Sequence, residues 1–250
     1  MESDSELFSR VEDLVERSDR SGTVTHTHFL TPKEQYVLER WLKSRKNTRY
    51  IIGSGVENTE RNLILFYPEW MDREEAVFSE FVCGVGVKVG FGEPGHRDYL
   101  GSVLGLGIKR EWIGDILING DQGYIICLKS VQDTLLNELT HISRYGVKTS
   151  AVSLDMIPSK KTEVQKKTFT VQSMRLDSIT ASAFNISRSK VVNYIKEGLV
   201  TLNYQECLTP GKEIREGDII SVRGYGKGVT SSVKGMSKKG RIIVEFDVYS

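Results

Sequence analysis

The sequence RLDSITASAFNISRSKVVNYIKEGLVTLNYQECLTPGKEIREGDIISVRGY, residues 175–225, carries the pattern that decides the fold of the C-terminal third of this chain. It predicts a short helix, a polar break and a second helix that opens with positively charged residues. Asp177 is expected to be the N-cap of the first helix and Ser187 that of the second, because each side chain offers an oxygen to unpaired N–H groups. The sequence therefore predicts two helices in close succession.

Two strands are predicted to follow the second helix. Gly198 is suited to end that helix, because glycine adopts the left-handed conformation without strain. The runs LVTLN (199–203) and DIISV (218–222) are apolar or alternate as strands do, and Pro210-Gly211 predicts a turn between them. The segment therefore has the order helix, helix, strand, turn, strand.

This segment closely resembles the S-four RNA-binding domain, the module named after the fourth protein of the small ribosomal subunit. The resemblance rests on RLD (175–177), SRSK (187–190), IKEGLVTLN (195–203) and EGDIISVRG (216–224). In this family the two helices form the surface that faces RNA. The resemblance implies RNA contacts by Arg175, Ser187, Arg188, Lys190, Lys196, Asn203, Arg223 and Lys227. From the residues alone, the alternative is that the basic side chains only solvate a helix face.

The charge of the chain is divided between its two ends. The 250 residues have a net charge of +1 and are 39% hydrophobic, which is enough for a substantial core in about two or three domains. Residues 1–159 carry 18 basic and 24 acidic side chains, a net charge of −6, whereas residues 160–250 carry 16 basic and 9 acidic side chains, a net charge of +7. A basic C-terminal region indicates that this end binds a polyanion.

The sequence predicts a cytoplasmic protein that does not enter a membrane. No apolar run reaches the roughly 18 residues of a membrane span. The first 20 residues are acidic and amphipathic, unlike a signal or transit peptide. Cys83, Cys127 and Cys207 lack CxxC spacing, which is typical of proteins from a reducing compartment.

Residues 1–72 are predicted to form a small α+β unit. Residues 5–17 and 32–45 have the pattern of helices. The second helix opens with TPKE (31–34), a capping-box signature with proline at the first helical position. RYIIG (49–53) and NLILFYP (62–68) predict strands on either side of a polar loop.

Residues 73–158 are predicted to form an RRM-like, or ferredoxin-like, plait with the order β-α-β-β-α-β. The expected elements are a strand at 78–90, a helix at 96–106, strands at 113–118 and 123–129, a helix at 131–142 and a strand at 147–155. An RRM stacks RNA bases on aromatic residues of its two central strands, and here the candidates are Phe81 and Tyr124. The topology therefore indicates RNA binding more strongly than its residues do. The segment 159–168, rich in Lys and Thr, is expected to link the plait to the S-four domain at 169–250.

Three runs ahead of the S-four segment extend the resemblance to nearly the whole chain. They are FLTPKEQ (29–35), the GSGVENTER loop (53–61) and HRDYLGSVLGLGIKREWIGDIL (96–117). In this order they resemble the YlmH family, bacterial RNA-binding proteins that are encoded among cell-division genes. The resemblance implies association with the large ribosomal subunit and a role in ribosome-associated quality control. There the S-four domain would hold ribosomal RNA and peptidyl-tRNA on a stalled, split subunit.

One run departs from the family pattern. Many relatives have a Gly-Arg-aromatic sequence after the final predicted strand, where this chain has Gly226-Lys227-Gly228. Lys227 keeps the positive charge for an RNA contact but lacks the planar guanidinium of those relatives.

Several runs resemble catalytic motifs without the context that those motifs need. RLDSIT (175–180) resembles the RLD-x-x-T run that carries the catalytic aspartate of pseudouridine synthases, but too few residues follow it for a catalytic domain. GMSKKG (235–240) resembles the KMSKS loop of class I tRNA synthetases, yet no Rossmann half precedes it. The glycine-rich GVGVKVGFG (84–92) lacks the spacing of a phosphate-binding loop.

The sequence therefore predicts a non-enzymatic, monomeric RNA-binding factor without a cofactor or a metal. His26 and His28 have metal-like spacing, but no ligand cluster accompanies them. Arg97 and Arg110 lie in the most distinctive run and are secondary candidates for RNA contact. The alternative is an RNA-modifying enzyme, similar to pseudouridine synthases, that its S-four domain brings to RNA.

Overall fold

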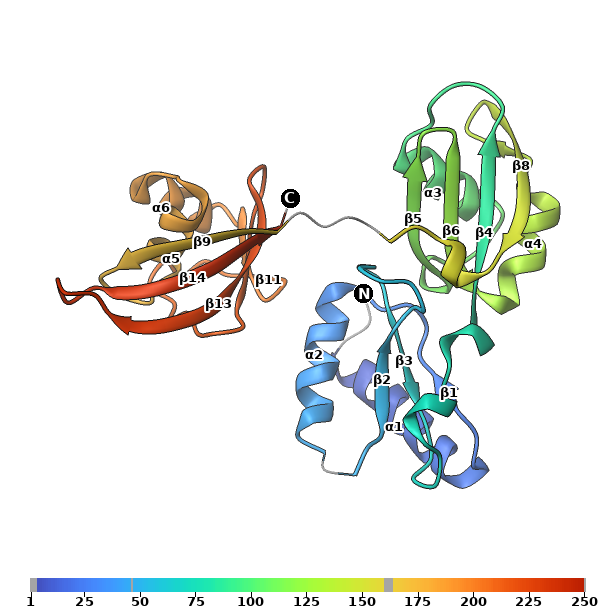
Figure 1. Ribbon diagram of the computed structural model, residues 1–250, viewed down its shortest axis with the longest axis horizontal. Coiled ribbons are helices and arrows are strands. Elements are labelled where there is room, and N and C mark those ends of the chain that lie inside the picture. The colour runs from blue at the N-terminus through green and yellow to red at the C-terminus, as the bar shows by residue number, and fades with distance from the viewer. Residues whose placement is uncertain (1–3, 46, 160–163, 250) are drawn as a thin grey trace. The chain divides into compact units, whose positions relative to one another are not determined.

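The computed structural model describes residues 4–45, 47–159 and 164–249 (Figure 1). Over these residues the protein has an α+β fold with three sheets, and it divides into two compact units, Met1–Lys160 and Lys161–Ser250. The first unit contains two of the sheets and the second contains the third. None of the helices in the described ranges is long and apolar enough to span a membrane.

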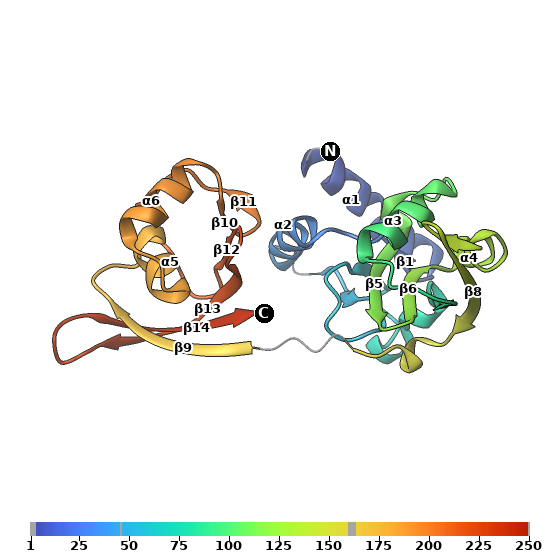
Figure 2. The same ribbon diagram turned by 90° about the horizontal axis from the view of Figure 1, so that it is seen from above.

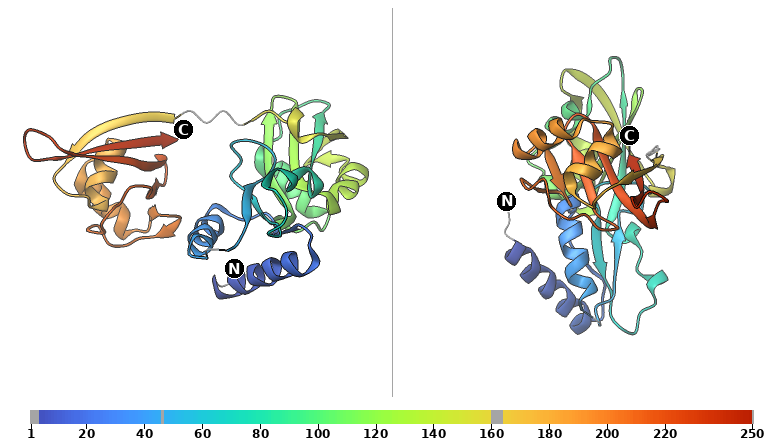
Figure 3. Two further views of the ribbon diagram at one scale, coloured as in Figure 1. Left: turned by 60° about the horizontal axis from the view of Figure 1, so that its bottom comes forward. Right: turned by 90° about the vertical axis from the view of Figure 1, so that its left-hand side faces the viewer.

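Two helices and a three-stranded sheet form the N-terminal part of the first unit. Its elements are α1 (Asp4–Ser21), β1 (Thr25–His26), α2 (Pro32–Lys43), β2 (Tyr50–Gly53) and β3 (Leu63–Phe66), with β3 in the middle of the sheet. Figure 3 shows the two helices in blue. All four side chains of β3 are buried, because both faces of the sheet are covered. Ile64 and Phe66 contact the two helices, whereas Leu63 and Leu65 contact the neighbouring plait.

Helix α2 begins as the sequence predicts. The Thr31 side chain accepts a hydrogen bond from the Glu34 backbone N–H, and the Glu34 carboxylate accepts one from the Thr31 N–H at 2.7 Å. Pro32 occupies the first helical position, where its missing N–H has no cost. The capping box is confirmed, and it commits the Glu34 carboxylate to the helix start.

The second sheet confirms the predicted plait. Its elements are β4 (Val82–Val89), α3 (His96–Gly105), β5 (Ile113–Asn119), β6 (Gln122–Leu128), α4 (Gln132–Glu138), β7 (His141–Ile142) and β8 (Tyr145–Val152). The strands lie in the order β5-β6-β4-β8-β7, and each neighbouring pair is antiparallel. Strands β4 and β6 are central, as an RRM-like order requires.

Two boundaries of the plait differ from the prediction. Its first strand begins at Val82 rather than at residue 78, because Phe78–Glu80 form a 3-10 turn. Its second helix ends at Glu138 rather than at residue 142. The chain turns back there into the short β7–β8 hairpin, with Ser143 in the left-handed conformation at φ 55°.

The sheet of the plait is covered on both faces. Helices α3 and α4 cover one face, where Val85 and Ile125 lie in the core. The other face shares a core with the N-terminal part, formed by Phe29, Leu63, Leu65, Val82, Ile126, Leu128 and Ile157. Tyr124 packs against this core, and the Phe81 ring lies 4.8 Å from the His26 ring. The aromatic residues that could have stacked on RNA are therefore used inside the protein.

The C-terminal unit is an antiparallel sheet with two helices on one face (Figure 2). Its elements are β9 (Val164–Val171), α5 (Leu176–Phe184), α6 (Arg188–Lys196), β10 (Val200–Leu202), β11 (Gln205–Glu206), β12 (Ile219–Val222), β13 (Gly226–Met236) and β14 (Ile242–Tyr249). The strand order is β11-β10-β12-β13-β14-β9. Residues of both helices and of the sheet form one core, whose described residues lie between Phe169 and Val248. Gly198 follows α6 with φ 71°, as predicted.

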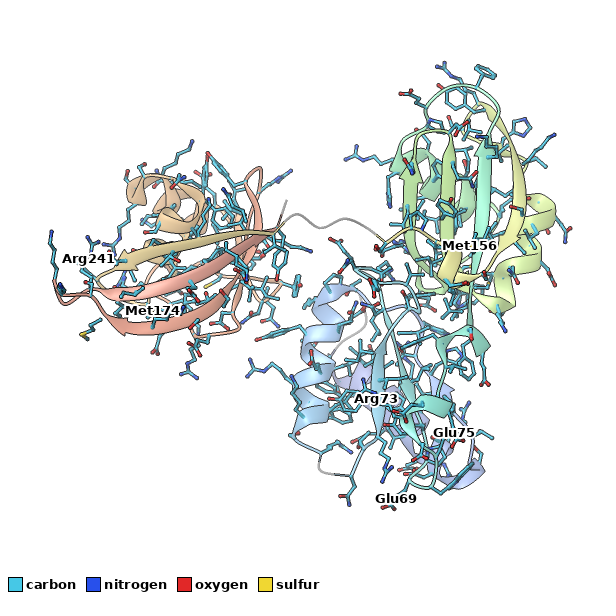
Figure 4. All side chains as sticks on the ribbon, viewed as in Figure 1. Glu69, Arg73, Glu75, Met156, Met174 and Arg241 are labelled. Carbon is cyan, nitrogen blue, oxygen red and sulfur yellow. The ribbon has the colours of Figure 1, made fainter. Side chains whose placement is uncertain are left out.

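The sequence predicted β10 and β12 of this sheet but not its other four strands, β9, β11, β13 and β14. Strand β9 begins at Val164 and pairs with β14 along its whole length, so the end of the segment 159–168 belongs to the sheet instead of a linker. Residues 160–163 of that segment lie outside the described residues. The β13–β14 hairpin follows the strand that was predicted to be the last, and Arg241 lies near its tip (Figure 4).

Glycine is required at one point of this hairpin. A Cβ atom at Gly228 would lie 2.6 Å from the Asp247 carbonyl oxygen and 2.3 Å from the Phe246 ring. The run Gly226-Lys227-Gly228 forms the first three residues of strand β13, so it does not follow the final strand of the sheet.

Candidate nucleic-acid interface

The start of helix α5 differs from the prediction at Asp177. Arg175 occupies the N-cap position, and Asp177 is the second helical residue. Backbone carbonyls cap this helix instead, because the N–H groups of Leu176 and Asp177 donate to the carbonyl oxygens of Lys212 and Pro210 at 2.8 and 3.0 Å. The Asp177 carboxylate is therefore not needed as a cap.

The Asp177 carboxylate instead binds two arginines. Its side chain is 3% exposed and accepts hydrogen bonds from Arg175 Nε at 3.1 Å and from Arg188 Nη2 at 2.9 Å. Arg175 Nη2 and Arg188 Nε also donate to it. Burial acts to raise the pKa of Asp177, but the hydrogen bonds and charges of the two guanidiniums outweigh it and hold the pKa below its ordinary value. An ionised carboxylate thus joins the starts of α5 and α6.

The two guanidiniums remain accessible to a ligand. The side chains of Arg175 and Arg188 are 44% and 54% exposed. Each uses Nε and Nη2 toward Asp177, so the carboxylate does not engage Nη1. A guanidinium is a planar, multi-donor group that matches phosphate oxygens and stacks on bases. The pair is therefore suited to an RNA backbone.

Lys190 and two tyrosines form a second group at the start of α6. Lys190 Nζ donates to the Tyr225 hydroxyl at 3.1 Å and lies 5.4 Å from the centre of the Tyr194 ring. The Tyr194 and Tyr225 rings are 6.0 Å apart, and Tyr225 is 41% exposed. The hydrogen bond from Lys190 lowers the pKa of Tyr225. Positive charge beside an exposed ring is suited to an unstacked base.

The sequence analysis named Lys190 but not the two tyrosines. Tyr194 follows Lys190 by four residues and so lies on the same side of α6. That spacing was a signal for a cation–π pair. Tyr225 comes from the turn between β12 and β13, and no local pattern predicts that it approaches α6.

Four of the remaining predicted contacts lie at the ends of elements. Ser187 is the N-cap of α6, as predicted, although its side chain does not bond the N–H groups of the first turn. Lys196 ends the same helix and is exposed, as is Arg223 after β12. Lys227 is half-buried in β13.

Asn203 has an internal role that the sequence did not predict. Its side-chain amide donates to the Asp218 carboxylate at 2.8 Å, and its oxygen accepts from the Ile219 N–H at 2.9 Å. Its backbone adopts φ 52°, which asparagine tolerates in turns. Asn203 therefore holds the turn after β10 against the start of β12.

The two secondary candidates are not brought together. Arg97 is exposed in the first turn of α3, next to Asp98, whose carboxylate accepts from the Gly95 N–H. Arg110 follows the end of that helix and is half-buried, with Nη1 donating to the Ile113 carbonyl oxygen at 2.6 Å. Arg110 therefore contributes to the internal structure of the first unit.

The two histidines with metal-like spacing have other neighbours. His26 Nδ1 lies 2.8 Å from the Thr27 carbonyl oxygen, and His28 Nδ1 lies 3.3 Å from the Glu111 carboxylate. In the part of the chain that the structure describes, no three His, Cys, Asp or Glu side chains are grouped so as to hold a metal ion.

Comparison with known proteins matches both units. The family model described as "Putative RNA-binding domain in YlmH" matches residues 74–156, and that of the S4 (S-four) domain matches residues 174–220. The curated "Ribosome-associated protein quality control protein P2" of Bacillus subtilis (strain 168) is 29% identical over 221 residues, which are 88% of this chain and 86% of that protein. The solved structure of cell division protein ylmH from Streptococcus pneumoniae covers 61% of this chain and 92% of its own, with a TM-score of 0.50. At 22% identity it shows a shared fold.

The two family matches fall on the elements described above. The first covers the plait, and the second covers helices α5 and α6 with strands β10 and β11 and the start of β12. The Arg175–Asp177–Arg188 cluster lies within the S4 match. Two RNA-binding domains give the chain an RNA-binding role. The chain therefore carries the domain matched by the YlmH model followed by an S4 domain, and it is similar to the Bacillus subtilis relative over most of its length.

Proposed function

We propose that this protein is a non-enzymatic RNA-binding factor of the large ribosomal subunit that acts in ribosome-associated quality control of stalled translation. The Bacillus subtilis relative carries this process in its name. The observation that carries the proposal is the Arg175–Asp177–Arg188 cluster, because one buried carboxylate fixes two half-exposed guanidiniums on adjacent helices. A basic surface of this kind suits folded RNA with exposed phosphates and unstacked bases.

On this proposal the S4 domain binds ribosomal RNA and peptidyl-tRNA on the large subunit. The protein acts in the cytoplasm, as a monomer and without a cofactor. Asp177 supports binding over catalysis, because a nucleophilic aspartate must reach its substrate and this one is 3% exposed beneath two arginines. The pseudouridine-synthase-like alternative therefore lacks a reactive aspartate at this position.

The Arg188→Ala variant tests the proposal. We expect it to bind large ribosomal subunits more weakly by about 1–3 kcal/mol, because it removes a phosphate-binding fork. It should remain folded with about 1 kcal/mol less stability, since Asp177 keeps its hydrogen bonds from Arg175. The measurement is co-sedimentation with purified large subunits, with and without bound peptidyl-tRNA.

Arg241→Ala is the matched control for this variant. It removes the same charge from an exposed arginine of the same unit, near the tip of the β13–β14 hairpin. We expect it to bind large subunits nearly as the wild type does. Wild-type affinity in Arg188→Ala, or an equal loss in both variants, would reject the assignment of this surface.

Tyr225 should contribute to binding through its ring. Replacing it by leucine is expected to weaken binding to an RNA hairpin with an unpaired loop by about 1–2 kcal/mol, since stacking on a base is lost. Tyr225→Phe keeps the ring and removes only the bond from Lys190, so its affinity should stay close to wild type. Titration with the hairpin and with a blunt RNA duplex separates the two effects. Equal losses for Leu and Phe, or a loss on the duplex as large as on the hairpin, would rule out stacking.

A further inference from the structure

A cavity of about 600 Å³ lies in the first unit, where segments from distant parts of the sequence meet. Its lining comes from Arg10 in α1, from residues 28–31 and Glu34 at the start of α2, from Arg61 ahead of β3, from Leu104 in α3 and from residues 108–111 after that helix. Most of these residues belong to the runs FLTPKEQ, GSGVENTER and HRDYLGSVLGLGIKREWIGDIL. The function proposed above uses none of these runs.

Basic groups dominate the lining of this cavity. They are Arg10, Arg61, Lys109 and Arg110, against two acidic residues, Glu34 and Glu111. His28 also lines the cavity, but burial lowers its pKa, so its imidazole is not counted among the cations. Glu34 caps α2, and Glu111 lies 3.3 Å from His28. The surrounding unit is acidic overall, so general composition does not account for a basic cavity.

Backbone carbonyls accept hydrogen bonds from two half-buried arginines of the cavity, Arg61 and Arg110. Arg61 donates from Nη2 to the Phe29 carbonyl oxygen at 2.8 Å and from Nε to that of Ile113 at 3.2 Å. Arg110 Nη1 donates to the carbonyl oxygens of Ile113 and Gly114 at 2.6 and 3.2 Å. The Ile113 oxygen thus accepts from both guanidiniums. Over the described residues, neither arginine has a carboxylate in an ion pair with it.

Two like charges therefore stand close together in a half-buried place. Burial lowers the pKa of Arg110 to about 10, and the charge of Arg61 acts in the same direction. Burial also lowers the pKa of Arg61. The nearby carboxylates of Asp115 and, for Arg61, of Glu34 and Glu111 act in the opposite direction without forming an ion pair with either guanidinium among the described residues. An anion that entered the cavity would lower the free energy of both cations, because the groups that accept their hydrogen bonds are neutral carbonyls.

We infer that this cavity binds a phosphate group, carried by a nucleotide or by the backbone of RNA. Guanidinium groups match the oxygens of phosphate in plane and spacing, and Lys109 adds an exposed positive charge. The volume lies in the range of roughly 300–1,000 Å³ that is usual for sites of small ligands. The site belongs to the first unit and is distinct from the Arg175–Arg188 surface, so it can be tested separately from the proposed function.

The test is the thermal unfolding of the full-length protein in inorganic phosphate and in chloride at equal ionic strength. We expect phosphate at about ten times its Kd to raise the wild-type Tm by about 4 °C over chloride. Leu104, which is 38% exposed, lines the same cavity. A Leu104→Glu variant brings a competing carboxylate to the cations. We expect this variant to lose the phosphate response, which is the increase of Tm in phosphate over chloride. Its Tm in chloride should not fall.

Two lysine variants control for charge, and one arginine variant controls for the other surface. Lys109→Gln should halve the phosphate response or reduce it further. Lys148→Gln, which changes an exposed lysine on β8 outside the lining, should keep it. Arg188→Ala should keep it as well, because that residue lies in the other unit. A response that persists in both Leu104→Glu and Lys109→Gln, or that disappears only in Arg188→Ala, would overturn the inference.

The source of the phosphate is distinguished by two further ligands. Uridine monophosphate and a short single-stranded RNA are titrated into the wild type and into Leu104→Glu. Stabilisation by the nucleotide that Leu104→Glu abolishes supports a small-molecule site. Stabilisation by the RNA at a much lower concentration, with the same loss in the variant, supports a backbone phosphate. Failure of phosphate, nucleotide and RNA alike to stabilise the wild type through this cavity would refute the inference.

Discussion

A fragment of residues 164–250 is expected to bind structured RNA by itself, with an affinity that falls about 100-fold between about 50 and 200 mM salt. Each phosphate contact releases counterions, and about four contacts by Arg175, Arg188, Lys190 and Lys196 give a slope of this size. The fragment should fold alone, because its core draws only on its own residues. Filter binding over a salt series measures the slope.

The boundary of this fragment follows from strand β9. A fragment that began at residue 169 would lose the first five residues of a strand that pairs with β14 from Val164 to Val171. We expect that shorter fragment to be less stable and to bind RNA more weakly per mole of protein.

The complementary fragment of residues 1–159 should bind RNA poorly. It carries a net charge of −6, and its plait uses the face that an RRM offers to RNA to pack against the N-terminal part. Tight, salt-sensitive binding by this fragment would instead place the main RNA site in the first unit, with Arg97, Arg110 and the basic cavity as its centre.

Features that depend on neighbours in the sequence were predicted well. The capping box of Thr31 and Glu34 and the left-handed Gly198 each involve only a few consecutive residues. The order of strands and helices in the plait also followed from hydrophobic patterns along the chain. These elements are specified locally, so a single sequence is enough to find them.

Features that depend on distant contacts were not predicted. The role of Asp177 is set by Arg188, eleven residues on, and by the loop that caps α5 in its place. Strand β13 contains glycine, serine and lysine instead of a regular apolar alternation, so its place in the sheet comes from its pairing with β14. The shared core behind the plait likewise requires Phe29 and Leu65 to meet Ile126, which no local pattern indicates.

The candidate site shows the same division. Arg175, Arg188 and Lys190 were identified from the sequence through the resemblance to the S-four domain, and the structure places all three at the starts of α5 and α6. Tyr225 was missed because a turn brings it to α6. The partners of Asn203 became clear only when Asp218 was placed beside it.

The Asp177→Asn variant should be less stable than the wild type by about 2 kcal/mol at neutral pH. A helix cap would tolerate asparagine, but a buried carboxylate between two guanidiniums does not, since the amide removes the charge and turns an N–H group toward a cation. The loss is smaller than for a fully buried ion pair, because both arginines are about half exposed. Urea unfolding of the two proteins across a pH series measures it.

The sign of the pH dependence identifies the carboxylate. The folded protein holds the pKa of Asp177 below its ordinary value, so the stabilisation is fully present above the unfolded pKa of about 3.9. It is lost as the pH falls through the lower folded pKa, so the stability difference between wild type and Asp177→Asn should shrink below about pH 4. The control Asp247→Asn, on the face of β14 away from the core, should show no comparable difference. A stability difference between wild type and Asp177→Asn that persists at low pH would mean that asparagine disturbs the packing and not the charge.

RNA binding by the same variant decides between positioning and catalysis. Asp177→Asn adds positive charge to the domain, which alone would strengthen binding to RNA. We nevertheless expect binding to large subunits to weaken several-fold, because the two arginines lose the acceptor that orients them. Stronger binding would mean that Asp177 only neutralises its partners. Unchanged binding together with the loss of one modified nucleoside in ribosomal RNA or tRNA would identify Asp177 as a catalytic residue, and the protein as an enzyme.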